Sequence, residues 1–167
     1  MLLPAALGLG GCAAEPSPPR LKPDDVVNSA QQLLTDRCLT RLGLTPPRPG
    51  QRPPSKAEGR RVTDALFGAG HTELTLTLPT GYVVRAHSDG CLAAAQRTLY
   101  GDQRRWFRAS TIVNNLRPEA RYRGRSLAAV RELHRTEVAE VARLRARALH
   151  QAITLLSQQR QKENHPT

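Results

Sequence analysis

The chain has 167 residues, the size of one ordinary domain, and 39% of them are hydrophobic. It carries 25 Lys and Arg residues against 14 Asp and Glu residues, a net charge of +11 at pH 7. This composition excludes a long acidic disordered chain, a collagen-like repeat and a protein with several membrane spans. With one Trp, three Tyr and two Phe, the core must be built from Leu, Val and Ala.

The first stretch of the chain is apolar. Residues 1–11 carry no charge and lead directly into Cys12. The stretch suits the hydrophobic part of a signal peptide and is too short for a bilayer, which takes about 20 apolar residues. Leu9-Gly10-Gly11-Cys12 resembles the bacterial lipobox, whose Cys receives diacylglycerol before cleavage. We therefore predict a lipoprotein signal peptide over 1–11, lipidation of Cys12 and a flexible lipid-anchored tether over 12–23. The alternative is a buried N-terminal element with a free Cys.

The number of cysteines agrees with this prediction. The chain has three Cys, and an odd number in a secreted protein leaves one for another role. If Cys12 holds the lipid, Cys38 and Cys91 remain, and they would form a disulfide in an oxidising compartment. The alternative is two separate buried thiols in a cytosolic protein. Two Cys without a CxxC spacing and five scattered His do not make a ligand set, so we predict no metal site and no cofactor.

The first predicted helix begins at Pro23, where Asp24 and Asp25 suit the free N–H groups of a first turn. Apolar residues then recur at steps of three and four, as on one helix face, until Gly43 favours an end. These residues are Val27, Ala30, Leu34, Cys38 and Leu42. Cys38 therefore faces the predicted core.

The next segments are a connector and a short helical turn. Residues 45–56 hold five Pro, which indicates an irregular linker in preference to a proline-rich ligand for an aromatic groove. Residues 60–67 predict a short helical turn that ends at Gly68.

A β-hairpin is predicted over residues 73–86. Residues 73–78 alternate between polar and apolar, as a strand with one buried face should. Pro79-Thr80-Gly81 supplies the turn, and residues 82–86 form the returning strand. Because a two-stranded hairpin is marginal alone, its Leu face must rest on helices.

Two further helices are predicted in the second half of the chain. One runs from Leu92 to about Val113, weakened in its middle by Gly101 and Asp102 and ended by Asn114-Asn115 and Pro118. The other keeps a three-four apolar rhythm over 127–155, which corresponds to a length of about 45 Å. The polar residues 158–167 predict a disordered tail.

Together these elements predict a mainly helical α+β domain over 24–157, with one hairpin, one disulfide and a long C-terminal helix. The predicted core residues share an apolar side chain on the inner face of their element. They are Leu34, Leu39, Leu42, Leu76, Leu92, Leu99, Trp106, Val138 and Val141.

Two motifs carry a resemblance to a known group. They are Asp89-Gly90-Cys91-Leu92 with Ala95, and Leu99-Tyr100-Gly101-Asp102 with Trp106. In these the chain resembles a group of actinobacterial secreted lipoproteins that have no assigned activity. The resemblance implies that Cys38, in the first helix, pairs with Cys91, and that the Ala/Arg/Leu-rich residues 146–152 belong to a long final helix. It implies a fold and a location, and it carries over no catalytic residue.

Nothing in the chain predicts an enzyme. His87-Ser88-Asp89 contains the residue types of a hydrolase triad, but adjacent side chains point in different directions, whereas a triad must converge. The sequence has no G-x-S-x-G, P-loop, dinucleotide-binding glycine pattern or H-E-x-x-H. Asp102 and Glu119 are too isolated in sequence to propose as an acid–base pair.

The strongest concentration of charge lies in residues 97–125, where Trp106, Phe107 and Tyr122 lie among arginines. Guanidinium groups bind phosphate in pairs of hydrogen bonds, and interleaved aromatics are typical of surfaces that bind phosphate-rich polymers. A solvated helix face is the alternative. The arginines of this segment are Arg97, Arg104, Arg105, Arg108, Arg117, Arg121, Arg123 and Arg125.

These observations favour a non-enzymatic envelope protein, anchored by its lipid to the extracytoplasmic face of the cell membrane. Its basic face would meet anionic lipid or a wall polymer, and its long C-terminal helix could pair with a protein partner. The alternative function is that of a basic helical nucleic-acid-binding protein in the cytosol.

Overall fold

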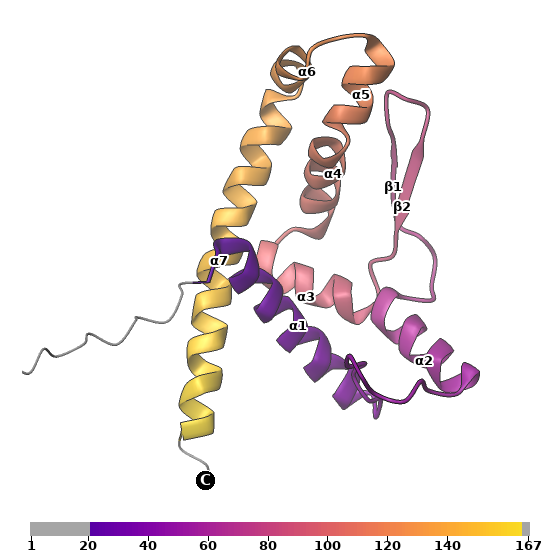
Figure 1. Ribbon diagram of the computed structural model, residues 1–167, viewed down its shortest axis with the longest axis vertical. Helices are drawn as coiled ribbons and strands as arrows, with labels where there is room; N and C mark the ends of the chain where they lie inside the picture. The colour runs from indigo at the N-terminus through magenta and orange to yellow at the C-terminus, as the bar shows by residue number, and fades with distance from the viewer. Residues whose placement is uncertain (1–20, 165–167) are drawn as a thin grey trace, which may run out of the picture.

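The computed structural model describes residues 21–164, so the predicted signal peptide, Cys12 and most of the tether lie outside the described residues. In this range the chain forms seven helices and one antiparallel two-stranded sheet (Figure 1). The predicted mainly helical class with a single hairpin is confirmed. No helix in residues 21–164 combines the length and apolar character that a membrane span requires.

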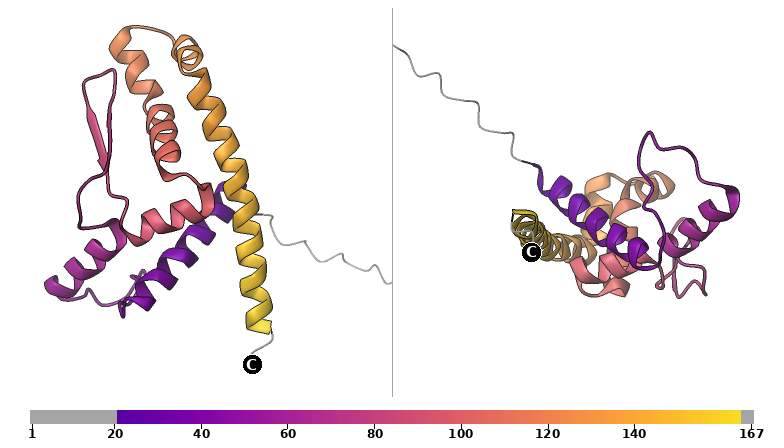
Figure 2. Two further views of the ribbon diagram at one scale, coloured as in Figure 1. Left: turned by 180° about the vertical axis from the view of Figure 1, so that it is seen from behind. Right: turned by 90° about the horizontal axis from the view of Figure 1, so that it is seen from below.

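The elements in chain order are α1 (Pro23–Arg41), α2 (Lys56–Phe67), β1 (Leu74–Thr77), β2 (Val83–Ala86), α3 (Cys91–Tyr100), α4 (Gln103–Asn114), α5 (Leu116–Arg123), α6 (Leu127–Leu133) and α7 (Arg135–Asn164). The 30 residues of α7 form the longest element, about 45 Å. Its N-terminal half lies beside α4, and its middle and C-terminal parts pack against α1 and α3, as the opposite views of Figures 1 and 2 show.

The main core lies where α7 crosses α1 and α3. Ala30 on α1 and Ala148 and Ala152 on α7 are fully buried, and their small side chains let the two helices approach closely. Leu99 of α3 fills the space beside them. Because the helices approach closely at these alanines, the interior is packed without many large side chains.

A second core cluster lies between α4, α5 and α6, and the hairpin packs against it. It contains Ile112, Leu116, Ala120 and Val130, and Leu76 of β1 packs against it. Register pairs Leu76 with Val84 across the hairpin. The Leu face of the hairpin therefore rests on helices, as predicted.

The prediction of one helix from Leu92 to Val113 is wrong, because the structure has two helices there, α3 and α4. Gly101 adopts φ +88°, a conformation that strains any residue with a side chain, and it ends α3. The Asp102 carboxylate then accepts a hydrogen bond from the Arg105 backbone N–H at 3.0 Å and starts α4 in a new direction.

Helix α5 is absent from the predicted elements, because Pro118 indicated an end. Pro118 is the third residue of α5, within the first turn, where a backbone N–H has no partner inside the helix. Proline is therefore tolerated there. Gly124 in the left-handed conformation ends this helix.

The last predicted helix also differs in its limits. The helix is interrupted at His134, which separates α6 from α7. Helix α7 then continues to Asn164, so the predicted disordered tail is wrong for residues 158–164. The Arg37 guanidinium of α1 donates a hydrogen bond to the Gln159 side chain, which holds this polar end of α7 against α1.

The short helical turn predicted over 60–67 is longer in the structure. The Ser55 hydroxyl accepts a hydrogen bond from the Glu58 N–H at 3.2 Å, so α2 already begins at Lys56.

The predicted core is confirmed for Leu39, Leu99 and Val141, which are buried. It is wrong for Leu42, which is 55% exposed because α1 ends at Arg41 and turns Leu42 away from the interior. The remaining predicted core residues are half-buried: Leu34, Leu76, Leu92, Trp106 and Val138.

The predicted disulfide is present. Cys38 of α1 and Cys91 at the start of α3 are bonded with a Cα–Cα distance of 5.7 Å across 53 residues of sequence. The residue before Cys91 is Gly90, which lies against the backbone at the end of α2. A Cβ on Gly90 would meet the Gly68 nitrogen at 2.5 Å and the Leu66 carbonyl oxygen at 2.6 Å. The end of α2 can therefore approach the disulfide only because residue 90 has no side chain.

We expect Gly90→Ala to lower the free energy of unfolding by about 1–3 kcal/mol, because backbone atoms of α2 must move away from the added methyl group. The matched control is Gly59→Ala inside α2, where an added Cβ would meet only the Pro54 Cγ at 3.8 Å. This control should be neutral or stabilise by up to about 1 kcal/mol. Thermal and denaturant unfolding followed by circular dichroism measures both, and equal stability of the two variants would contradict the close packing.

Candidate functional site

Half of the predicted anion-binding arginines make specific contacts inside the protein. Arg105 pairs with Glu140 at 3.0 Å and Arg108 approaches Glu137 at 3.9 Å, so both connect α4 to α7. Two others share this structural role: Arg97 donates hydrogen bonds to the Ser88 carbonyl and the Gln103 side chain, and Arg123 pairs with Glu119 at 2.6 Å. These four arginines therefore stabilise the fold and are less available to a ligand.

The other four arginines are exposed and take part in no ion pair within residues 21–164: Arg104, Arg117, Arg121 and Arg125. Arg117 and Arg121 are four residues apart on α5, which places them on one face of the helix. Arg125 follows in the turn to α6. Tyr122 is 67% exposed and directly follows Arg121, which places it about 100° round the helix axis from that arginine. We call Arg117, Arg121, Tyr122 and Arg125 the α5 surface.

The aromatic residues of the basic segment do not form one exposed platform. The Trp106 ring stacks on Tyr100 with ring centroids 3.7 Å apart and planes inclined by 8°. Burial raises the pKa of the Tyr100 hydroxyl, Arg145 opposes the rise and Asp24 adds to it. The single Trp of the chain is thus engaged with another protein side chain rather than open to bases of a nucleic acid.

Glu119 is not isolated in the folded protein. Its side chain is 3% exposed, and its second oxygen lies 2.9 Å from His134 Nε2 while the first accepts from Arg123. His134 occupies the break between α6 and α7, and its other ring nitrogen lies 3.9 Å from Glu137. Such contacts compensate the cost of burying a carboxylate, and they fix the α5–α6 corner to α7.

The residues His87, Ser88 and Asp89 do not form a triad. The Ser88 hydroxyl donates to the Glu73 carboxylate, so no nucleophile–base hydrogen bond joins it to His87. His87 Nδ1 lies 3.8 Å from an Asp89 oxygen and is buried without a hydrogen-bond partner. The geometry that serine hydrolysis requires is therefore not assembled at these residues.

Asp89 instead fixes a loop. Its carboxylate accepts a hydrogen bond from the Gly70 N–H at 2.9 Å, and this N–H is the main reason that the pKa of Asp89 is lowered. The contact holds the segment after α2 against the turn that leads into Cys91. Asp89, Gly90 and Cys91 together bind three neighbours: the Gly70 loop, the end of α2 and, through the disulfide, α1.

No cluster of three or more His, Cys, Asp or Glu residues is arranged for a metal ion among residues 21–164. Cys38 and Cys91, for which two separate buried thiols were the alternative, are used in the disulfide.

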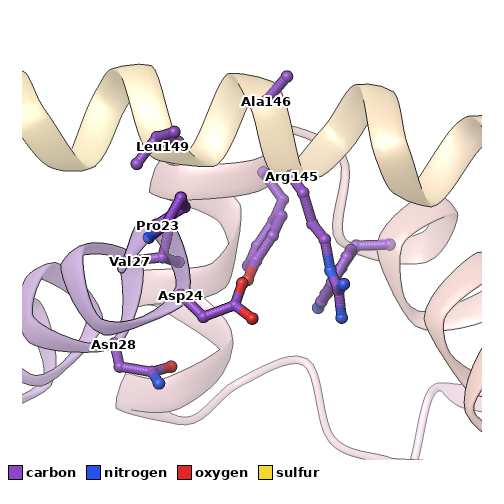
Figure 3. A pocket seen from close by; sticks show the side chains of 9 residues that line it. Pro23, Asp24, Val27, Asn28, Arg145, Ala146 and Leu149 are labelled. Atoms are coloured by element: carbon purple, nitrogen blue, oxygen red, sulfur yellow. The ribbon is translucent and has the colours of Figure 1, made fainter. Parts of the chain in front are cut away.

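A cavity of about 420 Å³ lies between the start of α1 and the middle of α7 (Figure 3). Asp24 and Arg145 point into it from these two helices, and the stacked Tyr100 and Trp106 line it from α3 and α4. The apolar part of its wall comes from Pro23, Val27, Ala146 and Leu149, and Asn28 adds an amide. This site was not predicted from the sequence, because Asp24 was interpreted only as an N-terminal helix residue and Arg145 lies far away in sequence.

Comparison of the chain with protein-family models, with curated proteins and with solved structures returned no match.

We expect Asp89→Asn to reduce the acid dependence of stability. Because the pKa of Asp89 is lowered in the folded state, its contribution is fully present above its ordinary pKa of about 4 and is lost as the pH falls through the folded value. The melting temperatures of wild type and variant should therefore differ at neutral pH and converge in acid. Asp64→Asn, on the exposed side of α2, is the control and should leave the profile parallel to wild type. A constant difference for Asp89→Asn down to about pH 2 would refute this role.

Proposed function

We propose that this chain is an exported protein, held at the extracytoplasmic face of a cell membrane by a lipid on Cys12. The observation that carries the proposal is the Cys38–Cys91 disulfide. Disulfides form and persist in oxidising compartments outside the cytosol and are rare inside it. A protein whose first and third helices are joined in this way is suited to an extracytoplasmic location.

The remaining cysteine supports the same proposal. With Cys38 and Cys91 paired, Cys12 is the third Cys of the chain, and it follows Leu9-Gly10-Gly11 at the end of an uncharged apolar stretch. This spacing is what lipoprotein signal peptides use, and the resemblance to actinobacterial secreted lipoproteins favours the same location.

We propose further that the protein is a non-enzymatic binding module whose α5 surface faces anionic lipid or a wall polymer. The support is the grouping of three exposed arginines and Tyr122 on and just after one helix. Exposed Tyr and Arg side chains suit a membrane–water interface, where each Arg adds about 1 kcal/mol of attraction.

The tether has the reach for both contacts. The 11 residues from Cys12 to Lys22 would span at most roughly 40 Å when fully extended. Helix α1 starts beside Arg145 of α7, and α7 begins at Arg135, about 15 Å away along its axis. The tether is therefore long enough to cover the distance from the start of α1 to the N-terminal end of α7, next to which His134 contacts Glu119 of α5.

Other partners find less support. Nucleic acid binding would use the aromatic and basic residues of 97–125, of which Trp106 is stacked on Tyr100 and half of the arginines are engaged. A protein partner along α7 would use its apolar stripe, but Leu144, Ala148 and Ala152 of that stripe are buried against α1 and α3, which leaves Ile153 as an exposed residue.

We expect Cys12→Ala to abolish incorporation of labelled fatty acid and to move the protein from the membrane fraction to the soluble fraction. Mass spectrometry of the wild-type protein from cells should find a mature N-terminus at Cys12 bearing diacylglycerol. Cys38→Ala is the control, and any chain that survives folding without the disulfide should still be acylated. Retention of Cys12→Ala in the membrane, or an unmodified wild-type Cys12, would contradict the anchor.

We expect the triple change Arg117→Gln, Arg121→Gln and Arg125→Gln to weaken binding of the unacylated protein to phosphatidylglycerol vesicles by about tenfold to a hundredfold. Binding of the wild type should fall as salt rises, because the contact is electrostatic. The control removes the same charge elsewhere, through Arg41→Gln, Arg61→Gln and Arg160→Gln, which are all exposed. If the two triple variants lose affinity equally, net charge alone accounts for the binding and the α5 surface is not a site.

A further inference from the structure

We propose that the cavity between the start of α1 and the middle of α7 binds a small zwitterionic ligand, an amino acid or a short peptide. Asp24 would receive the ammonium group, Arg145 the carboxylate, and the wall beside Tyr100 and Trp106 the ligand's side chain. This inference goes beyond the envelope function proposed above and holds whether or not Cys12 carries a lipid.

The first argument is the pair of opposite charges. Asp24 and Arg145 both point into the same cavity (Figure 3), yet no ion pair joins them in the described part of the chain. Each charge therefore remains available to a ligand that brings its counterpart. A guanidinium presents two parallel N–H groups to a carboxylate, and a carboxylate accepts up to several N–H bonds from an ammonium group.

Two other carboxylates on the same helices are paired with arginines inside the protein. Further along α7, Glu140 accepts from Arg143 at 2.7 Å and from Arg105 at 3.0 Å, so the protein satisfies it internally. On α1, Asp36 is paired with Arg48 at 2.6 Å. Asp24 and Arg145 are both exposed and are not paired with each other within residues 21–164, and Asp24 differs from the unpaired Asp25 in that it lines a cavity with an arginine on the other side.

The second argument is the chemistry of the wall. Tyr100 is buried and stacked on Trp106, and Val27 and Leu149 add aliphatic surface. Flat aromatic and branched aliphatic groups bind apolar side chains, while a few polar groups fix the orientation of the ligand. Asn28 contributes an amide that can donate and accept.

The third argument is size. The cavity of about 420 Å³ lies in the range of small-molecule sites. This volume suits an amino acid or a dipeptide, and the cavity is open to solvent on the side where Asp24 and Arg145 are exposed. The opposed charges disfavour purely anionic and purely cationic ligands, because each would bring a like charge to one end.

The experiment titrates the purified protein with leucine, leucyl-leucine, N-acetyl-leucine and leucine amide. Isothermal calorimetry reports binding, and fluorescence reports occupancy of the cavity because Trp106 is the single Trp of the chain. We expect leucine or leucyl-leucine to bind and to change the fluorescence. Blocking the ammonium or the carboxylate should weaken binding by about tenfold or more, the loss of one charge-assisted hydrogen bond.

Variants that neutralise one charge then show which residue binds the ammonium group of the ligand and which binds its carboxylate. Asp24→Asn should lose the preference for a free ammonium, and Arg145→Gln the preference for a free carboxylate, each with about a tenfold loss of affinity for the zwitterion. Asp25→Asn is the matched control for Asp24, because it removes a neighbouring first-turn charge of α1 from outside the cavity. Arg143→Gln is the corresponding control on α7.

Three outcomes would overturn the proposal. One is the absence of heat and of fluorescence change with all four compounds up to about 10 mM, since a site weaker than this carries no useful affinity. Another is equal binding of the blocked and free compounds. The third is an equal effect of Asp24→Asn and Asp25→Asn. None of these outcomes bears on acylation of Cys12, so failure here is separate from failure of the proposed anchor.

Discussion

The covalent link between Cys38 and Cys91 holds together the two helices, α1 and α3, against which α7 packs. It joins α1 to α3 across a sequence separation of 53 residues, and the loop that it closes includes the proline-rich connector, α2 and the hairpin. On the chain-entropy model, a closed loop of this length stabilises the fold by roughly 4 kcal/mol. The stabilisation matters in this protein because its main core is built on Ala30, Ala148 and Ala152, which bury little apolar surface each.

Helix α7 uses two different kinds of contact along its length. Near its N-terminal end, Glu137 and Glu140 face arginines of α4, whereas from Leu144 onward it packs apolar residues against α1 and α3. The change occurs beside the cavity that contains Arg145. Much of the basic charge of residues 97–125 is thus part of the framework, and three of the four remaining arginines lie on or just after α5. The net charge of +11 therefore combines two kinds of arginine: those that pair with carboxylates inside the fold and those that are exposed and unpaired in the described residues.

The hairpin, the first helix and the helical class were predictable because each follows from a local pattern. Alternation identified residues 73–86, and a three-four rhythm from Pro23 identified α1. These patterns did not predict the breaks at Gly101 and His134 or the helix that contains Pro118. A periodic apolar stripe continues across a change of direction, and only the packing of α4, α5 and α6 around the second core decides where the chain turns.

Residue types at short spacing are enough to identify the cysteine pattern, the uncharged first stretch that leads to Cys12 and the periods of the secondary structure. Tertiary structure alone decided which arginines are satisfied by carboxylates, that Glu119 meets His134, and that Trp106 stacks on Tyr100. It also decided that Asp24 and Arg145 share a cavity. The physical reason is distance: these groups lie on different elements, and their interactions exist only after the helices have packed.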